Sequence, residues 1–316
     1  MPFRVYSNLV IWALSLSGIV SCTSSSNQYS PLLETIHRSS PQFIDVGGNQ
    51  IAYVETGQGD PLVFIHGFGG SIWNWEYQFT GLSGSHRVII LDLLGSGMSA
   101  KPDIPYSPKR LVEFFEQFLD SLKLQRATLV GNSMGAGLAL AMALTSPKRV
   151  SALVLISGFP SDPQESVVSP YYQEFLTRRP PLWLAKFGNW MAGRWATKTL
   201  LQEIIHDHAL ITPLVIERSY QNRHRSDFLP PLFSLIDHID QWKEEFGPRL
   251  NTIRHPTLIL WGADDRVFPP DVGQQLQATI PGSKFHLIAN AGHIPQWEQP
   301  SQVNALITEF LKQAFS

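Results

Sequence analysis

The sequence is poor in cysteine and in charge. One cysteine, Cys22, occurs among 316 residues, so the chain cannot form an internal disulfide. Charged residues make up 16% of the chain and the net charge is −2, with no block of like charges outside residues 178–198. We therefore expect no nucleic-acid partner, and a globular protein whose 43% hydrophobic residues suffice for one large core plus an insertion. The sequence leaves the oligomeric state open.

Cofactor motifs are also missing. The chain has neither a glycine-rich phosphate loop nor the glycine turn of dinucleotide-binding proteins. His206 and His208 resemble a metal-binding pair, but side chains two positions apart on a helix face different ways, and no carboxylate–histidine cluster completes a site. We therefore expect neither a metal nor an organic cofactor.

The first residues have the pattern of an export signal. A basic residue precedes an apolar run over residues 9–20, which is short for a bilayer span and fits the h-region of a signal peptide. The tetrad Ile19-Val20-Ser21-Cys22 resembles the lipobox of bacterial lipoproteins, in which the cysteine carries the lipid. We interpret residues 1–21 as a lipoprotein-type signal peptide, Cys22 as the lipidation site and residues 22–42 as a flexible tether. The protein would then be exported and anchored to a membrane. The alternative is an ordinary cleaved signal peptide and a secreted or periplasmic protein.

Short, continuously apolar runs recur along the rest of the chain, at residues 62–65, 88–91, 128–130, 153–156 and 258–260. Because they do not alternate with polar residues, they are typical of strands covered on both faces, as in a mainly parallel sheet.

Other patterns surround these runs. A glycine pair separates two expected strands over residues 43–46 and 51–55. Ser107 and Pro108 are suited to begin a helix, and an apolar face with helical spacing follows; the last residues carry another. Alternating strands and helices predict a doubly wound α/β fold, with core parts at residues 43–157 and 247–316.

Residues 158–246 break the alternation. They contain helical patches cut by two proline pairs and many aromatic residues, with no convincing strand. An insertion of this kind over the strand ends of an open sheet forms a lid above the crevice where such folds bind ligands. We expect the substrate pocket under this lid to be lined by Asn132, Trp183, Trp190, Trp195 and Ile294.

A Gly-x-Ser-x-Gly motif lies where one apolar run meets an apolar helical segment. The run over residues 128–130 ends at Gly131, Ser133 follows, and the chain passes through Gly135 into the segment 138–144. A strand, a tight turn and a buried helix in this order place the serine hydroxyl at the tip of a strained turn. A side chain at either glycine would collide with the neighbouring strand and helix. We expect Ser133 to be a nucleophile.

Further motifs follow the other expected strands, at residues 66–70, 92–99, 261–269 and 291–295. Together with the Gly-x-Ser-x-Gly motif they resemble the α/β-hydrolase family, over nearly all of the chain from residue 43 onward. Serine, acid and histidine occur in the family's chain order, Ser…Asp…His. The resemblance implies the α/β-hydrolase fold, with its lid inserted before the strand that carries the acid.

The resemblance assigns chemical roles. The hydroxyl of Ser133 is too weakly acidic to attack unaided, so His293 is expected to remove its proton while a carboxylate orients the imidazole. Two adjacent aspartates compete for the last role. The family's Gly-x-x-Asp-x-x-x-Pro pattern, which here starts at Gly262, points to Asp265, and we expect Asp264 to be a neighbouring loop residue.

The resemblance also implies an oxyanion hole. Its donors would be the backbone N–H groups of Met134, which follows the nucleophile, and of Phe68, in the loop after the first buried strand. His66 in the same loop is expected to be a structural hydrogen-bonding residue.

The branch of the family is harder to assign. Dehalogenases and epoxide hydrolases carry an aspartate nucleophile, which disfavours both. The segment around Ser133 resembles hydrolases that cleave carbon–carbon bonds in ring-fission products. Those enzymes usually have tryptophan after the catalytic histidine, where this chain has Ile294, and a Pro-Gly-Ala-containing oxyanion loop that this chain lacks. We therefore expect a serine hydrolase of carboxylic esters, including lipid or long-acyl esters, acting through an acyl-enzyme. Carbon–carbon hydrolysis of ring-fission-type diketones is the alternative, and a non-catalytic member that binds a small ligand is a third possibility.

The lid contains a basic, aromatic segment. Residues 178–198 hold five cations, Arg178, Arg179, Lys186, Arg194 and Lys198, and no acid, with apolar residues interleaved. Such a segment could lie in the headgroup region of an anionic bilayer. In the alternative, its apolar residues pack on the core while the Lys and Arg stems extend around them.

Overall fold

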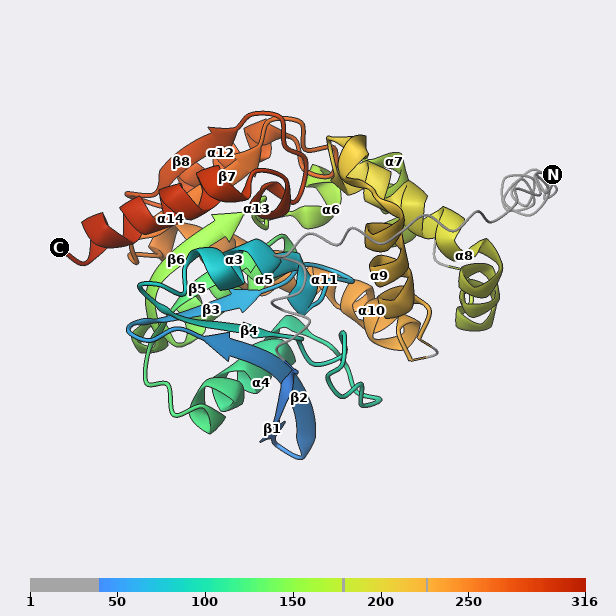
Figure 1. Cartoon of the computed structure of the whole chain (residues 1–316), viewed down its shortest axis with the longest axis horizontal. Coiled ribbons are helices and arrows are strands. Elements are labelled where there is room, and N and C mark those ends of the chain that lie inside the picture. The colour runs from blue at the N-terminus through green and yellow to red at the C-terminus, as the bar shows by residue number, and fades with distance from the viewer. Residues whose placement is uncertain (1–39, 178–179, 226) are drawn as a thin grey trace, which may run out of the picture.

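The computed structural model describes residues 40–177, 180–225 and 227–316 (Figure 1). The expected signal peptide, Cys22 and nearly all of the expected tether lie outside these residues, as do Arg178 and Arg179. Within the described ranges no helix is both long and apolar enough to cross a membrane.

An eight-stranded sheet forms the centre of the molecule, in the order β1-β2-β4-β3-β5-β6-β7-β8. The first two strands form an antiparallel hairpin and β2 pairs antiparallel with β4, whereas all other pairs are parallel. The strands are β1 Gln42–Val46, β2 Asn49–Thr56, β3 Pro61–Ile65, β4 Arg87–Leu91, β5 Ala127–Asn132, β6 Val150–Ile156, β7 Thr257–Gly262 and β8 Lys284–Ile288. The mainly parallel α/β sheet expected from the apolar runs is confirmed.

The edge strand β8 was not expected from the sequence. Its five residues are mostly exposed or half-buried, with only Ile288 fully buried. A strand covered on one side only lacks the continuous apolar run that marks the central strands.

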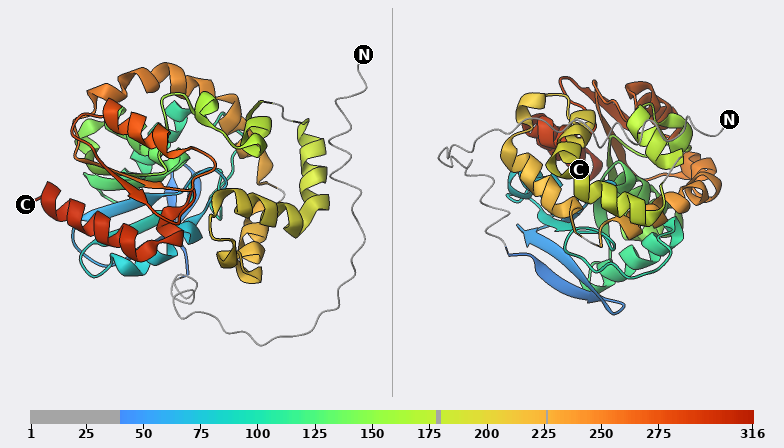
Figure 2. Two further views of the ribbon diagram at one scale, coloured as in Figure 1. Left: turned by 90° about the horizontal axis from the view of Figure 1, so that it is seen from above. Right: turned by 90° about the vertical axis from the view of Figure 1, so that its right-hand side faces the viewer.

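Helices cover both faces of the sheet (Figure 2). Alternate residues of β3 point to opposite sides: Val63 and Ile65 belong to one buried cluster and Leu62 and Phe64 to the other. The core helices are α3 Glu76–Gly81, α4 Pro108–Ser121, α5 Met134–Thr145, α12 Pro270–Thr279, α13 Pro295–Glu298 and α14 Pro300–Ala314. Helices α4, α5 and α12 pack on the first face, and α3 and α14 on the second.

The segment between β6 and β7 forms a helical cap. Its helices are α6 Pro163–Ser166, α7 Pro170–Thr177, α8 Leu182–Ile204, α9 Pro213–Arg223, α10 Leu229–Asp237 and α11 Ile239–Glu245. Figure 1 shows them gathered at the end of the sheet to which the parallel strands point. The cap is thus inserted before β7, the strand that leads to the aspartate pair, as the family resemblance implies.

Candidate active site

Ser133 occupies a strained turn between β5 and α5. Its φ of 52° and ψ of −122° lie in a region that residues with a side chain rarely adopt. Two glycines allow the backbone of the turn to lie close to its neighbours. A Cβ at Gly131 would lie 2.4 Å from the carbonyl oxygen of Gly135, and a Cβ at Gly135 would lie 2.1 Å from the carbonyl oxygen of Ile65. The described residues include no hydrogen bond from the Ser133 hydroxyl, so it is free to meet a substrate in the cavity that it lines.

His293 and Asp265 form a buried hydrogen-bonded pair. The Nδ1 atom of His293 lies 2.8 Å from Oδ2 of Asp265, and both side chains are buried. The other carboxylate oxygen of Asp265 accepts backbone N–H bonds from Val267 (2.8 Å) and Phe268 (3.1 Å). Three bonds fix this carboxylate, so it holds the imidazole with Nδ1 protonated and Nε2 available as a base.

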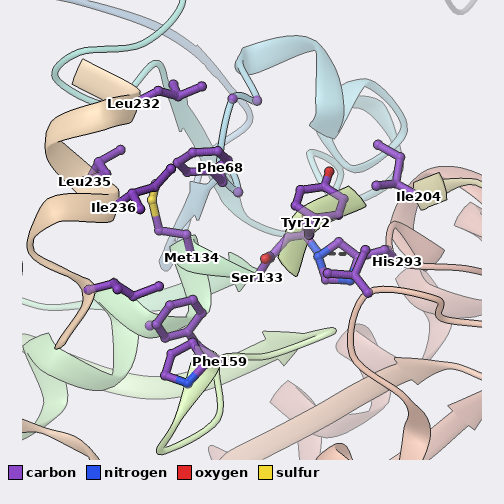
Figure 3. Close-up of a pocket in the computed structure, with 18 of the residues that line it drawn as sticks. Phe68, Ser133, Met134, Phe159, Tyr172, Ile204, Leu232, Leu235, Ile236 and His293 are labelled. Carbon is purple, nitrogen blue, oxygen red and sulfur yellow. Dashed lines mark hydrogen bonds between the residues drawn. The ribbon is translucent and has the colours of Figure 1, made fainter. Parts of the chain in front are cut away.

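The neighbouring aspartate lies elsewhere. Asp264 is partly exposed, and its carboxylate is 3.6 Å from Nδ1 of His206. The structure therefore brings Asp265, and not Asp264, to His293. Figure 3 shows the side chains of His293 and Ser133 next to each other at the cavity.

The two expected oxyanion donors flank the serine. Met134 is the first residue of α5, so its N–H has no partner within the helix. Phe68 lies in the loop after β3, which passes close to Ser133: a Cβ at Gly67 would lie 3.2 Å from Cβ of Ser133. The side chain of Phe68 packs against the buried cap cluster of Phe228, Leu229 and Leu232, so the cap helps to hold this loop.

His66 braces the loop after β3. Its Nδ1 is 2.8 Å from the carbonyl oxygen of Gly67, and its Nε2 accepts an N–H bond from Leu93 at 3.1 Å. This pattern requires a neutral ring with the proton on Nδ1, and burial lowers the pKa of His66. Nearby, Asp92 accepts from the backbone N–H groups of Ile72 and Met98, which joins the loops after β3 and β4.

A cavity of about 220 Å³ lies between the sheet end and the cap. Asn132 and Ile294 line it, as expected, together with apolar residues of the core and of the cap, including Phe159, Ile204, Leu232, Leu235 and Ile236 (Figure 3). Asn132 also fixes the site, because its amide donates to the carbonyl oxygens of Ile156 and His293, both at 3.1 Å.

The expectation that three lid tryptophans line the pocket is wrong. Trp183, Trp190 and Trp195 are not cavity-lining residues, and their exposed fractions are 70%, 62% and 56%. They lie on the outward face of α8. The residues of α8 that reach the cavity are Leu200, Leu201 and Ile204 near its end.

One cation of the cavity wall was missed by the sequence analysis. Arg223, the last residue of α9, is the only Lys, Arg, Asp or Glu among the described cavity-lining residues. Its Nη1 atom is buried and has no hydrogen-bond partner. Burial raises the pKa of Tyr172, a residue beside Ser133 in Figure 3, while the charge of Arg223 lowers it, which places the cation near the site. The only signal for Arg223 in the sequence is its position within the basic tripeptide Arg223-His224-Arg225.

A buried ion pair ties the cap to the core. Arg218 on α9 lies 3.0 Å from the carboxylate of Glu76 on α3, and the two side chains are 8% and 2% exposed. The other oxygen of Glu76 accepts from the indole N–H of Trp297 at 2.9 Å. These contacts hold α9, and therefore Arg223, over the cavity.

Glu298 secures the histidine loop. One of its carboxylate oxygens accepts from the N–H of Gly292 at 2.7 Å, and the other from the N–H groups of His206 (2.7 Å) and Asp207 (3.3 Å). Burial raises the pKa of Glu298, while these backbone bonds oppose the rise.

The arrangement can support nucleophilic chemistry at a carbonyl group. The elements present are a serine at a strained strand–helix turn, a histidine held by a carboxylate, the helix-start N–H of Met134, and the loop of Phe68 close to the serine. Together they can add an oxygen to a carbonyl carbon, accept the proton and stabilise the resulting oxyanion.

Comparison with known proteins agrees with this geometry. A family model described as the alpha/beta hydrolase fold matches residues 60–300. A 2-hydroxy-6-oxononadienedioate/2-hydroxy-6-oxononatrienedioate hydrolase of Paraburkholderia phymatum is 31% identical over 280 residues, which is 84% of this chain and 93% of that protein.

Solved structures give the same result. A meta-cleavage product hydrolase from Pseudomonas fluorescens IP01 is 26% identical with a TM-score of 0.75, covering 86% of this chain and 98% of that one. A thermophilic esterase from Thermogutta terrifontis is 26% identical with a TM-score of 0.72, covering 88% of this chain and 100% of that one. The chain therefore belongs to the α/β-hydrolase family and is a hydrolase of that fold.

Proposed function

We propose that the protein is a serine hydrolase that cleaves a carbon–carbon bond next to a ketone in a small, carboxylate-bearing substrate. The observation that carries this proposal is the cation of Arg223, since no other Lys, Arg, Asp or Glu is present among the described cavity-lining residues. The hydrolase of Paraburkholderia phymatum named above supports it, because the substrates in its printed name are dicarboxylates. This proposal departs from the ester hydrolysis expected from the sequence.

The state of Arg223 favours an anionic ligand. A buried donor without a partner costs about 1–3 kcal/mol, and more when it is charged. A guanidinium meets a carboxylate with two parallel N–H bonds, and charge-assisted bonds of this kind are roughly twice as strong as neutral ones. A substrate carboxylate at Arg223 would remove the cost and set the distance between that carboxylate and Ser133.

The reaction uses the groups already described. Oγ of Ser133 adds to the ketone carbon as its proton passes to Nε2 of His293, and the N–H groups of Phe68 and Met134 bind the oxyanion. When the oxyanion collapses, the carbon–carbon bond breaks. Its electron pair leaves on the fragment that carries a second carbonyl, which a 2-hydroxy dienoate gains when its enol proton moves to a carbon of the chain. The pair is delocalised onto that carbonyl as an enolate, and His293 returns its proton to the fragment.

Water completes the cycle. His293 removes a proton from a water molecule that attacks the acyl group on Ser133, and the collapse of the second oxyanion releases a carboxylic acid and restores the hydroxyl of Ser133. One water is consumed and two products leave, with no oxidant or reductant.

Ester hydrolysis is the second candidate. It uses the same acyl-enzyme, with an alkoxide as leaving group. Ile294 supports this candidate, because it lines the cavity at the position where the ring-fission enzymes usually carry tryptophan, and so departs from their pattern.

The role of Arg223 can be tested with a matched pair of substrates. We expect Arg223→Gln to lower kcat/KM for a ring-fission diketone carboxylate by about 10²-fold, corresponding to a charged bond of about 1.5–3 kcal/mol, and to leave its methyl ester nearly unaffected. Arg225→Gln is the control, because that arginine is exposed and pairs with Asp227 outside the cavity. Equal losses for the acid and its methyl ester would show that Arg223 does not bind the carboxylate.

A further inference from the structure

Helix α8 turns its large apolar side chains outward. Five of them are at least half exposed: Trp183 (70%), Phe187 (54%), Trp190 (62%), Met191 (50%) and Trp195 (56%). Trp183, Phe187 and Trp190 are separated by four and three residues, which places them along one face of the helix, and Met191 is next to Trp190. Trp195 follows a kink at Gly193, whose φ of 52° and ψ of −135° are not helical. We call this set the α8 apolar face.

The opposite face of α8 is packed against the protein. Leu182 and Ala185 contact the buried cluster around Phe228, and Ala196 and Thr197 are buried. Leu182 and Ala185 precede the kink at Gly193, and Ala196 and Thr197 follow it. The rotation of both parts of α8 is therefore fixed, and the larger apolar residues are the ones left outside. The alternative in which the apolar residues of this segment pack on the core is wrong for the five residues of the α8 apolar face.

The α8 apolar face lies at the outer edge of the molecule. Figures 1 and 2 show the first half of α8 at the far side of the cap, away from the sheet. Large contiguous apolar surface is uncommon on a soluble monomer and marks a contact site.

Cations border the α8 apolar face. Lys186 and Lys198 are exposed on α8, one before and one after the kink at Gly193, and form no ion pair among the described residues. A third cation, Arg194, is held by Glu217 through two hydrogen bonds. The helix carries no acidic residue before Glu203.

We propose that the α8 apolar face docks on the surface of an anionic lipid bilayer. Three exposed tryptophans with phenylalanine and methionine suit the boundary between headgroups and acyl chains, where an indole ring buries its apolar body and keeps its N–H near water. The unpaired lysines match anionic headgroups, and the helix would lie in the interface plane without crossing the bilayer. The inference does not depend on which bond the enzyme cleaves.

A local probe tests the docking in the full chain. Because Cys22 is the only cysteine, the double substitution Cys22→Ser, Trp190→Cys leaves a single thiol in the α8 apolar face, to be labelled with an environment-sensitive fluorophore. With phosphatidylglycerol vesicles we expect a blue shift and a several-fold rise in emission. The matched control is Cys22→Ser, Leu287→Cys, which labels an exposed apolar position on β8, with no shift expected.

Charge is tested separately. Phosphatidylcholine vesicles should give a much weaker shift, and raising NaCl from about 0.1 to about 1 M should weaken the response, because the screening length falls from ~10 to ~3 Å. In the same labelled chain, Lys186→Gln with Lys198→Gln should reduce vesicle affinity about 25-fold, at about 5-fold per lysine. Lys312→Gln, at an exposed position of α14, should leave the affinity unchanged.

Three results would overturn the proposal. They are the absence of a shift at position 190 with anionic vesicles, an equal shift at position 287, and a shift that depends on protein concentration without vesicles, which would identify a second copy as the occupant. If Trp190→Cys fails to fold, Phe187→Cys reports on the same face. Turnover of a small soluble substrate without vesicles should be unchanged in Trp183→Ser and Trp190→Ser.

Discussion

The backbone N–H of His293 donates a 2.8 Å hydrogen bond to the carbonyl oxygen of Ile204, the last residue of cap helix α8. The same two segments also share the carboxylate of Glu298, which binds Gly292 on one side and His206 on the other. The histidine loop is thus held partly by the cap, and a displacement of the end of α8 would move His293.

Glu298 gives the first prediction, which concerns pH. Burial raises its pKa in the folded protein above the ordinary value of 4.5, so the folded state binds the proton more tightly than the unfolded state. Its contribution to stability is fully present below about pH 4.5 and is lost as the pH rises through the raised pKa. Glu298→Gln should remove this dependence. Urea unfolding between about pH 4 and 8 should therefore show the wild type losing stability relative to the variant as the pH rises. A wild type that gains stability relative to Glu298→Gln as the pH rises would contradict this prediction.

The second prediction separates the two adjacent aspartates. Asp265→Asn should slow turnover by about 10³–10⁴-fold, because it leaves His293 in the wrong tautomer and its cation unstabilised. Asp264→Asn should change turnover little, since Asp264 lies beside His206. Labelling of Ser133 by a fluorophosphonate probe should fall in the same order, with Ser133→Ala as the unlabelled control. Normal labelling of Asp265→Asn would contradict the assignment.

The third prediction concerns the attachment of the cap. Arg218→Met leaves the carboxylate of Glu76 buried without its cation, which should cost about 3–5 kcal/mol of unfolding free energy. Arg194→Met breaks an exposed ion pair of similar geometry and should have little measurable effect on stability. Thermal and urea unfolding of both variants give the comparison. Equal stability of the two variants would mean that the Glu76–Arg218 pair does not hold the cap.

The fourth prediction concerns localisation, for which we propose an exported lipoprotein on the basis of the sequence around Cys22. The wild-type protein should fractionate with membranes, and Cys22→Ser should release it or leave an unprocessed precursor. Mass spectrometry of the mature N-terminus gives the direct readout. A mature protein with an unmodified Cys22 thiol would favour an ordinary signal peptide.

The parts predicted from the sequence are those with a local cause. The central strands are continuously apolar because both of their faces are covered, and the turn at Ser133 needs glycines at fixed positions. The pairing of Asp265 with His293 followed from the spacing between Gly262 and Pro269 in the family pattern.

The parts that escaped prediction depend on tertiary contacts. Helical spacing shows that Trp183 and Trp190 share a face of α8, but it does not show whether that face looks inward. Arg223 could not be recognised as a substrate-binding residue from the sequence, because it reaches the cavity only when α9 packs over it. That packing depends on contacts between residues distant in sequence, such as Glu76 and Arg218. The edge strand β8 lacks the continuous apolar run from which the central strands were predicted.

The proposed carbon–carbon bond cleavage is tested most directly by comparing kcat/KM for two substrates under the same conditions. One is a 2-hydroxy-6-oxo dienoate carrying a terminal carboxylate, whose absorbance is lost as its carbon–carbon bond is cleaved, and the other is a p-nitrophenyl ester of an acid of similar size. We expect the purified protein to prefer the dienoate by at least about tenfold, and Ser133→Ala to abolish both activities. Rapid ester hydrolysis with no loss of the dienoate absorbance would contradict the proposal and favour an esterase.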